Sequence, residues 1–182
     1  MKFCNQCGEA VTHRIPDGDN RHRFVCDACG FIHYQNPRII AGCLPIYKDK
    51  VLLCKRSIEP RAGWWTLPAG FLENGETVAA GALRETTEEA NANAEILELY
   101  TLFSLPHISQ VYMFYRALLL DLDFSPGEET LETRLFSESE IPWDELAFPV
   151  ITQTLQHYYE DRKTGNFPIR PLEIIIDRSH PG

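Results

Sequence analysis

Three glutamates in one short stretch are the residues of this chain with the clearest chemical potential. Glu85, Glu88 and Glu89 follow Arg84 in the segment GFLENGETVAAGALRETTEEA, whose second half has helical character. At about 100° per residue their carboxylates fall within one sector of the helix, where like charges three or four residues apart repel. Oxygen ligands grouped in this way suit Mg²⁺ or Mn²⁺, which usually complete their coordination with substrate phosphates. The alternative is an ordinary solvated acidic helix face.

The position of these acids on the helix bears on that choice. Apolar side chains of the same helix form a stripe, and Glu85 and Glu89 lie at its margin. Partial burial there raises the energy of an unpaired carboxylate, and a bound cation would lower it again. Gly81 lies one turn before Glu85, and we expect its missing side chain to leave space for a ligand.

A second candidate site consists of four cysteines. Cys4-x2-Cys7 and Cys26-x2-Cys29 each end in a glycine, and a hairpin signal, Asp17-Gly18, lies between them. Two such pairs joined by a hairpin are typical of a zinc ribbon with structural Zn²⁺. Disulfides are the alternative and are more typical of secreted chains. The other cysteines, at positions 43 and 54, lie in apolar stretches and are expected to be buried thiols.

The composition limits the classes of function. Lys and Arg number 17 against 26 Asp and Glu, a formal net charge of -9, which disfavours non-specific binding to nucleic acid. An acidic protein can still bind a phosphorylated substrate when a metal ion lies between the two sets of negative charge. No apolar run has the length of a membrane span, and the first residues do not resemble a signal peptide. We expect a cytoplasmic protein without membrane contact.

The elements around these residues alternate between strands and helices. Residues 1–35 are expected to form the hairpin ribbon, residues 36–182 the main domain, and residues 61–76 a loop. Strands of mixed order with helices between them predict an α+β fold. The expected strands are 39–47, 50–56, 94–105, 110–124 and 131–137, and the expected helices are 77–90 and a segment beyond Pro149.

The charged positions around the helix follow a family pattern. Gly70, Glu76, Arg84-Glu85 and Glu88-Glu89 have the spacing G-x5-E-x7-R-E-U-x-E-E-x-G-U, where U is aliphatic, and the chain therefore resembles the Nudix family. Three positions depart from the pattern. A threonine at 86, expected to bond back to the carbonyl of residue 82, an asparagine at 91 and an alanine at 92 replace U, G and U, and none removes a carboxylate.

The resemblance implies a Nudix fold, in which helices sandwich a mixed sheet, and a metal-dependent pyrophosphohydrolase. It implies that Glu85, Glu88 and Glu89 bind Mg²⁺ or Mn²⁺, with the main-chain carbonyl of Ala69 as a further ligand. Arg84 and Glu76 are expected to brace the loop against the helix. Glu132 stands where relatives with a zinc ribbon carry another acid, so Glu89 and Glu132 are rival candidates for the catalytic base.

Two groups within the family suggest substrates. A four-cysteine ribbon before the Nudix domain resembles the NADH pyrophosphatases, but their S-Q-P-W-P-F-P-x-S array is here FSLPHISQVYMF, without its Trp and Phe. The segments YQNP, WTLPAG, SLPHISQVY and PGEETLETRLF are more similar to the plant chloroplast Nudix enzyme that cleaves FAD to FMN and AMP and also acts on ADP-ribose. FAD or ADP-ribose is therefore expected ahead of NADH, NAD or NAD-capped RNA.

The remaining candidates would contact a small nucleotide. We expect phosphate to bind basic side chains, and a base or flavin ring to bind side chains near the predicted strands. The alternatives are core aromatics and an exposed histidine. A homodimer is expected, and a non-catalytic Nudix-like sensor that uses the ribbon to bind a partner is the alternative from another class. The candidates are Arg56 and Arg61 for phosphate, and Phe103, His107, Gln110 and Tyr112 for the ring.

Overall fold

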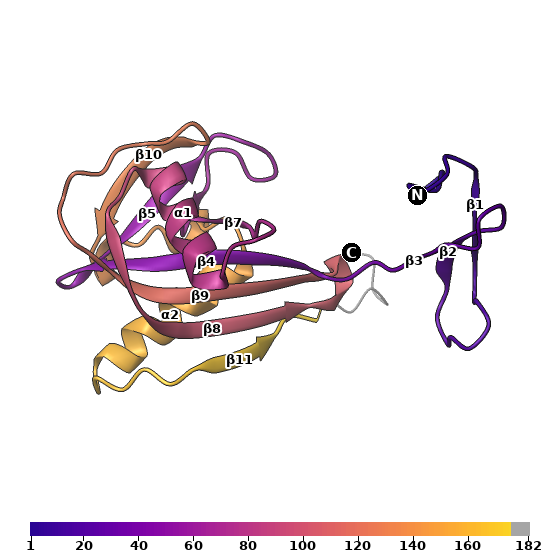
Figure 1. The fold of residues 1–182 in the computed structure, drawn as a ribbon. Coiled ribbons are helices and arrows are strands. Elements are labelled where there is room, and N and C mark those ends of the chain that lie inside the picture. Colours follow the sequence, from indigo (N-terminus) through magenta and orange to yellow (C-terminus); the bar gives the residue numbers. More distant parts are fainter. Residues whose placement is uncertain (176–182) are drawn as a thin grey trace. The chain divides into compact units, whose positions relative to one another are not determined.

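Residues 1–175 of the 182 are described by a computed structural model. The chain divides into two units, Met1–Pro37 and Arg38–Gly182 (Figure 1). The end of the second predicted domain, residues 176–182, lies outside the described residues. Each unit is considered separately below.

The first unit is a small antiparallel sheet of order β1-β2-β3. β1 (Val11–Arg14) and β2 (Arg23–Cys26) pair with Val11 opposite Cys26, so the predicted hairpin around Asp17-Gly18 is present. β3 (Ile32–His33) pairs with the other edge of β2 and was not predicted. The hairpin brings the two ends that carry the cysteine pairs together.

One mixed sheet organises the second unit, with the order β10-β5-β4-β9-β8-β11 (Figure 1). β4 runs parallel to β9 and β11 runs parallel to β8, whereas the other neighbours are antiparallel. Two short strands lie off this path, β6 beside β5 and β7 beside β4. The bounds are β4 Arg38–Tyr47, β5 Lys50–Arg56, β6 Trp65–Thr66, β7 Ala69–Phe71, β8 Ala94–Leu105, β9 Gln110–Leu119, β10 Thr130–Phe136 and β11 Arg170–Glu173.

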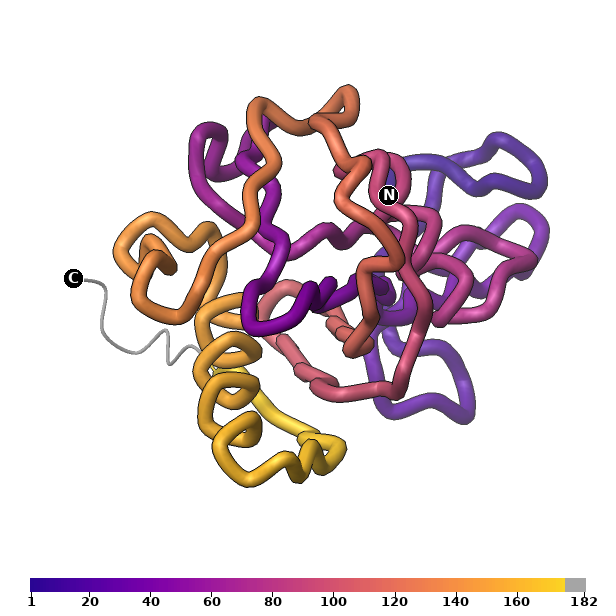
Figure 2. Tube along the Cα trace, turned by 90° about the vertical axis from the view of Figure 1, so that its left-hand side faces the viewer, coloured from indigo at the N-terminus to yellow at the C-terminus, as the bar shows by residue number. Residues whose placement is uncertain are grey.

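The two long helices, α1 (Val78–Ala90) and α2 (Pro149–Arg162), cover opposite faces of this sheet. On β4, Ala41 and Cys43 pack in a cluster with Ala82 of α1, whereas Leu44 packs in the largest cluster, which includes Ile151 of α2. Alternate residues of a strand point to opposite faces, so the predicted helix–sheet–helix arrangement is confirmed. Figure 2 shows the turns of α2 in orange and yellow. Within residues 1–175, no helix is long and apolar enough to cross a membrane.

Three details of the sequence-based elements were wrong. The expected loop at 61–76 contains β6 and β7, strands too short for a periodic pattern to reveal. The strand expected at 110–124 ends at Leu119. β11 was not predicted, because its central residue, Pro171, lacks a backbone N–H; as the end strand of the sheet, β11 tolerates this loss.

Both ends of α1 are capped, the first by the Thr77 side chain and the last by the left-handed backbone of Asn91. The Thr77 hydroxyl accepts the N–H of Ala80 at 3.2 Å, and Asn91 adopts a left-handed conformation with φ of 47°. The N–H of Asn91 donates to the carbonyl of Thr87 at 2.7 Å. Asparagine therefore serves in place of the glycine of the family pattern, because it tolerates this conformation better than most residues.

The segment between β9 and β10 is attached to the C-terminal end of α1. The side-chain amide of Asn91 donates to the carbonyls of Ser125 and Pro126, both at 3.2 Å, and the N–H of Gly127 donates to the carbonyl of Glu89 at 3.0 Å. A Cβ at Gly127 would lie 1.7 Å from the carbonyl oxygen of Glu88. Only glycine therefore allows this close approach of the two backbones.

Replacing Gly127 by alanine should detach this segment from the helix and destabilise the fold by about 1–3 kcal/mol, the usual cost of overpacking. Urea unfolding would measure the change, and amide hydrogen exchange should accelerate at Ser125 and Gly127. Gly165→Ala is the control, because a Cβ there meets nothing within 4 Å and only its φ of 72° opposes alanine. Unchanged exchange in Gly127→Ala would contradict the attachment.

Candidate functional site

The helix carboxylates lie directly against the backbone of β7. The N–H of Ala69 donates to Oε2 of Glu89 at 3.2 Å. A Cβ built on Gly70 would lie 2.3 Å from Oε2 of Glu85, so glycine is needed for the strand to pass this carboxylate. β7 therefore places main-chain atoms of residues 69 and 70 beside two of the three predicted ligands.

Arg84 joins the loop, the strand and the helix at this corner. Its guanidinium donates two hydrogen bonds to Glu76, at 2.8 and 3.1 Å, and one to the carbonyl of Phe71 at 3.1 Å. One of its nitrogens, Nη1, also donates to Glu85 at 2.7 Å and to Glu88 at 2.9 Å. These bonds keep the pKa of Glu76 below its ordinary value and raise that of Arg84. The predicted brace between Arg84 and Glu76 is thus present as a contact.

The pKa values of the two more buried carboxylates, Glu85 and Glu89, are both raised. Burial, followed by repulsion from Glu85, raises the pKa of Glu89 to about 8, although the Ala69 N–H opposes this shift. Burial also raises the pKa of Glu85, and the hydrogen bond from Arg84 acts in the opposite direction. Neither group is therefore a simple surface acid, and a cation beside them would favour the charged form of both.

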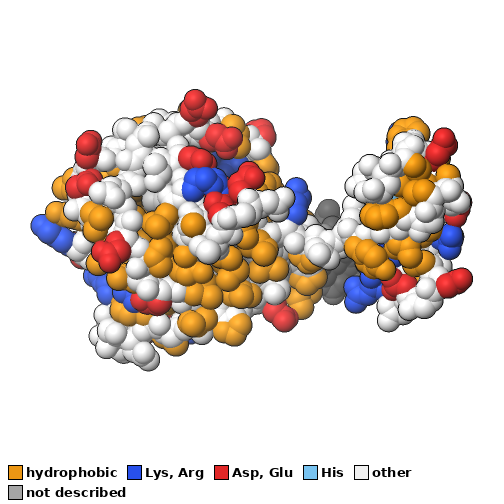
Figure 3. All heavy atoms as spheres, in the orientation of Figure 1, with side chains coloured by type: hydrophobic (Ala, Val, Ile, Leu, Met, Phe, Trp, Pro, Cys, Tyr) orange, Lys and Arg blue, Asp and Glu red, His pale blue; other side chains and the backbone are white. Residues whose placement is uncertain are grey.

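These carboxylates line one side of a cavity of about 1240 Å³. Figure 3 shows acidic and basic side chains grouped on the part of the surface formed by α1 and β7. Elsewhere the lining is largely apolar, with Leu105, Ile108, Phe148 and Ile174. The cavity thus combines an anionic wall, which suits a metal ion, with an apolar region, which suits a ring system.

Four of the six predicted substrate contacts line this cavity: Arg56, His107, Gln110 and Tyr112. The guanidinium of Arg56 donates to the carbonyl of Pro60 at 3.0 Å and lies 5.3 Å from the centre of the Phe148 ring. The carboxylates of α1 and Ala69 line the cavity as well.

Three predicted site residues lie elsewhere. Arg61 stacks on Trp64, with 4.6 Å between its guanidinium carbon and the ring centre, and does not line the cavity. Phe103 is fully buried in the core. Glu132 is exposed on β10, where a register irregularity lies between Thr130 and Glu132, and it too is absent from the lining.

Sequence reasoning missed several residues of the cavity. Glu128 and Glu129 line it from the segment attached to α1, and Glu129 contributes to raising the pKa of both Glu85 and Glu89. The sequence signal that could have revealed these two residues is the pair of adjacent acids directly after the Pro126-Gly127 turn. Gly81 was also misinterpreted: a Cβ there would meet Oε1 of Glu76 at 2.8 Å, so its missing side chain makes space for the brace and not for a ligand.

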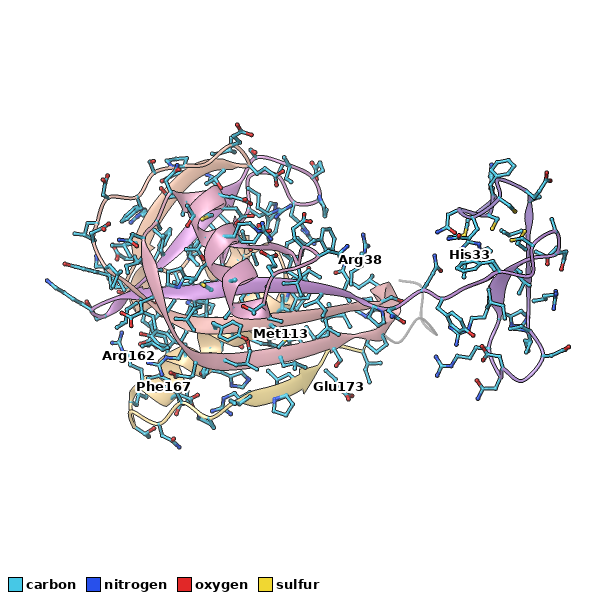
Figure 4. All side chains as sticks on the ribbon, in the orientation of Figure 1. His33, Arg38, Met113, Arg162, Phe167 and Glu173 are labelled. Atoms are coloured by element: carbon cyan, nitrogen blue, oxygen red, sulfur yellow. The ribbon has the colours of Figure 1, made fainter. Side chains whose placement is uncertain are left out.

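The four cysteines of the first unit converge on one point. All four sulfurs lie within 4.8 Å of one another, and Cys4–Cys29 and Cys7–Cys26 are separated by 3.7 and 3.5 Å. A tetrahedral zinc site with Zn–S bonds of about 2.3 Å has sulfurs about 3.8 Å apart, so the quartet fits this ion. All four are free thiols, not disulfides. Figure 4 shows sulfur atoms in the unit that carries His33.

The local backbone explains this convergence. The N–H groups of Gly8 and Gly30, both with positive φ, donate to the carbonyls of Cys4 and Cys26 at 2.9 and 2.8 Å. Each pair thereby closes a tight turn with its side chains on the same side. The N–H of Cys29 is the main reason that the pKa of Cys26 is lowered to about 7, which favours the thiolate that binds metal.

Fold and sites define the class: an α+β domain with a carboxylate-lined cavity, preceded by a four-cysteine unit. A profile described as the NUDIX domain matches residues 36–161, and one described as Nudix N-terminal matches residues 2–35. The chain belongs to the Nudix family and is a Nudix hydrolase with an N-terminal zinc-ribbon-type domain.

Similar proteins of known name agree with this assignment. The crystal structure of a Nudix hydrolase from Nitrosomonas europaea is 58% identical, covers 96% of this chain and all of that one, and superposes with a TM-score of 0.91. A protein named ADP-ribose pyrophosphatase from Methanocaldococcus jannaschii is 29% identical over 63% of this chain and 69% of its own length. A protein named NAD-capped RNA hydrolase NudC from Vibrio parahaemolyticus is 26% identical over 88% of this chain, but the match spans only 62% of that relative.

Stability without added Mg²⁺ or Mn²⁺ should depend on Glu89. Its pKa is about 8 when folded and near its ordinary value of 4.5 when unfolded. Between these values the folded state binds the extra proton, so the contribution of Glu89 to the unfolding free energy falls as pH rises. Glu89→Gln cannot ionise. From pH 5 to 8.5 wild type should lose stability relative to this variant, on the order of 3 kcal/mol. If the unfolding free energies of wild type and Glu89→Gln, measured with urea, change equally with pH, the buried position of Glu89 is contradicted.

Metal analysis should find one zinc ion per chain, bound by the cysteine quartet. Cys26→Ser should lower this content and make residues 1–37 sensitive to proteases, because folding of such a unit depends on its metal. Cys54→Ala, a buried cysteine outside the quartet, is the control and should retain zinc. Full zinc content in Cys26→Ser would refute this assignment of the ligands.

Proposed function

We propose that the protein hydrolyses the diphosphate linkage of a small nucleoside-diphosphate-linked substrate. The products are a nucleoside monophosphate and the remaining phosphorylated half. The observation that carries the proposal is the joint placement of Glu85, Glu88, Glu89 and Arg56 around one cavity whose other side is apolar. The cavity, about 1240 Å³ in volume, is larger than the roughly 300–1,000 Å³ of usual ligand sites and has room for an extended dinucleotide.

The donor set fits a hard divalent cation. Glu85, Glu88, Glu89 and the carbonyl of Ala69 would hold Mg²⁺ or Mn²⁺, because these cations take oxygen ligands and the four residues line one cavity. When bound, such an ion neutralises phosphate oxygens and lowers the pKa of the attacking water. The raised pKa of Glu85 and Glu89 supports this assignment, since two buried like charges gain from a shared cation.

The residues of the chain have separate tasks in this proposal. Arg56 binds phosphate through its guanidinium, whose hydrogen bonds within residues 1–175 go to the main-chain carbonyls of Ile58 and Pro60. Glu89 accepts the proton of the attacking water, and the Ala69 N–H orients its carboxylate. Glu129 replaces Glu132 as the rival base, because it lines the cavity and Glu132 does not. The apolar side, with Tyr112 and Phe148, excludes water and contacts a ring.

ADP-ribose and FAD are the substrates that we propose first. Similarity to the protein named ADP-ribose pyrophosphatase supports the former. The segments shared with plant FAD-cleaving enzymes support the latter, and the apolar lining around Tyr112 and Phe148 suits an isoalloxazine or adenine ring. A panel of FAD, ADP-ribose, NADH, NAD and diadenosine polyphosphates, assayed for release of monophosphate, ranks them.

A second candidate is the hydrolysis of NAD-capped RNA or NADH. The similarity to NudC extends over 88% of the chain and therefore reaches into the four-cysteine unit, which favours this alternative. The net charge of -9 favours short substrates over RNA. Turnover of NAD-capped oligonucleotides in competition with FAD separates the two candidates.

We further propose that residues 1–35 form a structural unit apart from the catalytic domain, and that the protein is a cytoplasmic homodimer. Sedimentation tests the latter. A non-catalytic sensor remains the contrasting class, but the chain retains all the carboxylates of the family pattern, which supports an enzyme.

Glu89→Gln should lower kcat for the best substrate of the panel by about 10²–10⁴-fold, the usual contribution of a positioned proton acceptor. Glu129→Gln tests the rival base, and Glu95→Gln, an exposed acid on β8 outside the cavity, should retain wild-type kcat. Undiminished kcat in Glu89→Gln would remove this residue from the mechanism. Absence of Mg²⁺-dependent turnover for every compound would instead favour the sensor.

A further inference from the structure

Three arginines line the cavity, and the ion-pair partners of Arg84 differ from those of Arg38 and Arg56. Arg84 is neutralised by three glutamates. In contrast, within residues 1–175 no carboxylate oxygen lies within 4.0 Å of the guanidinium of Arg38 or of Arg56. In an acidic protein whose cavity is lined by seven glutamates, two cations without a carboxylate partner leave capacity for anionic groups of a ligand.

Arg38 is held at one end of the cavity by its backbone and its side chain. Its N–H donates to the carbonyl of Ser109 at 3.0 Å, and it pairs with Gln110 at the start of β4 (Figure 4). Its guanidinium carbon lies 4.7 Å from the centre of the Phe71 ring. The Phe71 ring packs against one face of the guanidinium. The nitrogens at the edge of the guanidinium stay available for a bidentate hydrogen-bonded contact with phosphate.

The position of Arg38 is separate from that of the reacting diphosphate. Phe71 follows Ala69 by two residues on β7, a rise of about 7 Å along the strand. Ala69 contacts Glu89, so Glu89 and Arg38 lie toward opposite ends of the short strand. Tyr112 lines the same cavity as the two cations, and both Arg56 and Arg38 act to lower the pKa of its hydroxyl, which burial raises.

We propose that Arg38, supported by Phe71, binds a phosphate carried on the ribose of the substrate, beyond the diphosphate that is cleaved. This proposal rests on the proposed function and specifies its substrate class: a nucleoside-diphosphate-linked molecule with a further ribose phosphate. The group can be a monoester, as in a 2′-phosphorylated dinucleotide, or the phosphodiester that begins an RNA chain. The net charge of -9 favours the monoester.

Steady-state kinetics with ADP-ribose and ADP-ribose 2′-phosphate test the subsite. In wild type the extra phosphate should lower KM about tenfold, the effect of one charge-assisted hydrogen-bonding contact. Arg38→Gln should abolish this preference, because KM rises at least tenfold for the phosphorylated substrate and less than threefold for ADP-ribose. The preference should also weaken as salt concentration rises.

Arg134→Gln is the matched control. Its guanidinium lies 4.8 Å from the centre of the Phe136 ring, nearly the distance in the Arg38–Phe71 pair, but Arg134 does not line the cavity. This variant should keep the wild-type preference. A comparison of ADP-ribose 2′-phosphate with a short NAD-capped oligonucleotide distinguishes the monoester from the phosphodiester. An unchanged KM ratio in Arg38→Gln, with both substrates cleaved, would overturn the subsite.

Direct binding separates failure of this inference from failure of the proposed function. Calorimetry should show that wild type binds adenosine 2′,5′-bisphosphate about tenfold more tightly than AMP, and that Arg38→Gln loses the difference. This result would support the subsite even if no compound is hydrolysed. Equal affinities of wild type for the two nucleotides would overturn it, whether or not the enzyme cleaves diphosphates.

Discussion

The site depends on one guanidinium that lets several carboxylates share a corner of the fold. Arg84 contacts Glu76 in the loop, the backbone of β7, and Glu85 and Glu88 on the helix. Without a cation at this point, the acids would repel one another and separate the loop from the helix. Glu89 is not among the carboxylates that Arg84 contacts in the described part of the chain; its carboxylate accepts the Ala69 N–H, and burial raises its pKa.

The helix that carries the candidate site was predictable, because residues close together in the sequence determine where it begins and ends and which side chains share a face. Helix position determines which side Glu85 and Glu89 occupy, and the caps at Thr77 and Asn91 define the bounds of α1. Glu132 illustrates the limit of this reasoning. A register irregularity lies between Thr130 and Glu132 in β10, and a bulge of this kind leaves no periodic signal in the sequence. The exposed position of Glu132, outside the cavity that Glu129 lines, was therefore not predictable.

Long-range packing accounts for the other differences. Phe103 and Tyr112 are opposite one another on β8 and β9, so strand periodicity alone treats them alike. β11, which the sequence did not reveal because of its proline, adds to the edge of β8 with Leu172 opposite Phe103, and the core encloses that ring. Tyr112 lies one strand farther inward and faces the cavity. Whether Phe103 or Tyr112 can reach a ligand is thus decided by β11 and by a helix, both distant from these residues in the sequence.

The replacement of the terminal glycine of the family pattern by Asn91 has a mechanical consequence. Glycine offers only its backbone at a helix end, whereas the amide of Asn91 also ties the helix to the segment that carries Glu128 and Glu129. The acids that α1 and this segment contribute to the cavity are thereby tied to each other, although more than thirty residues separate Asn91 from Ser125. Thermal motion of the helix would move both groups of acids together, so the spacing between them persists.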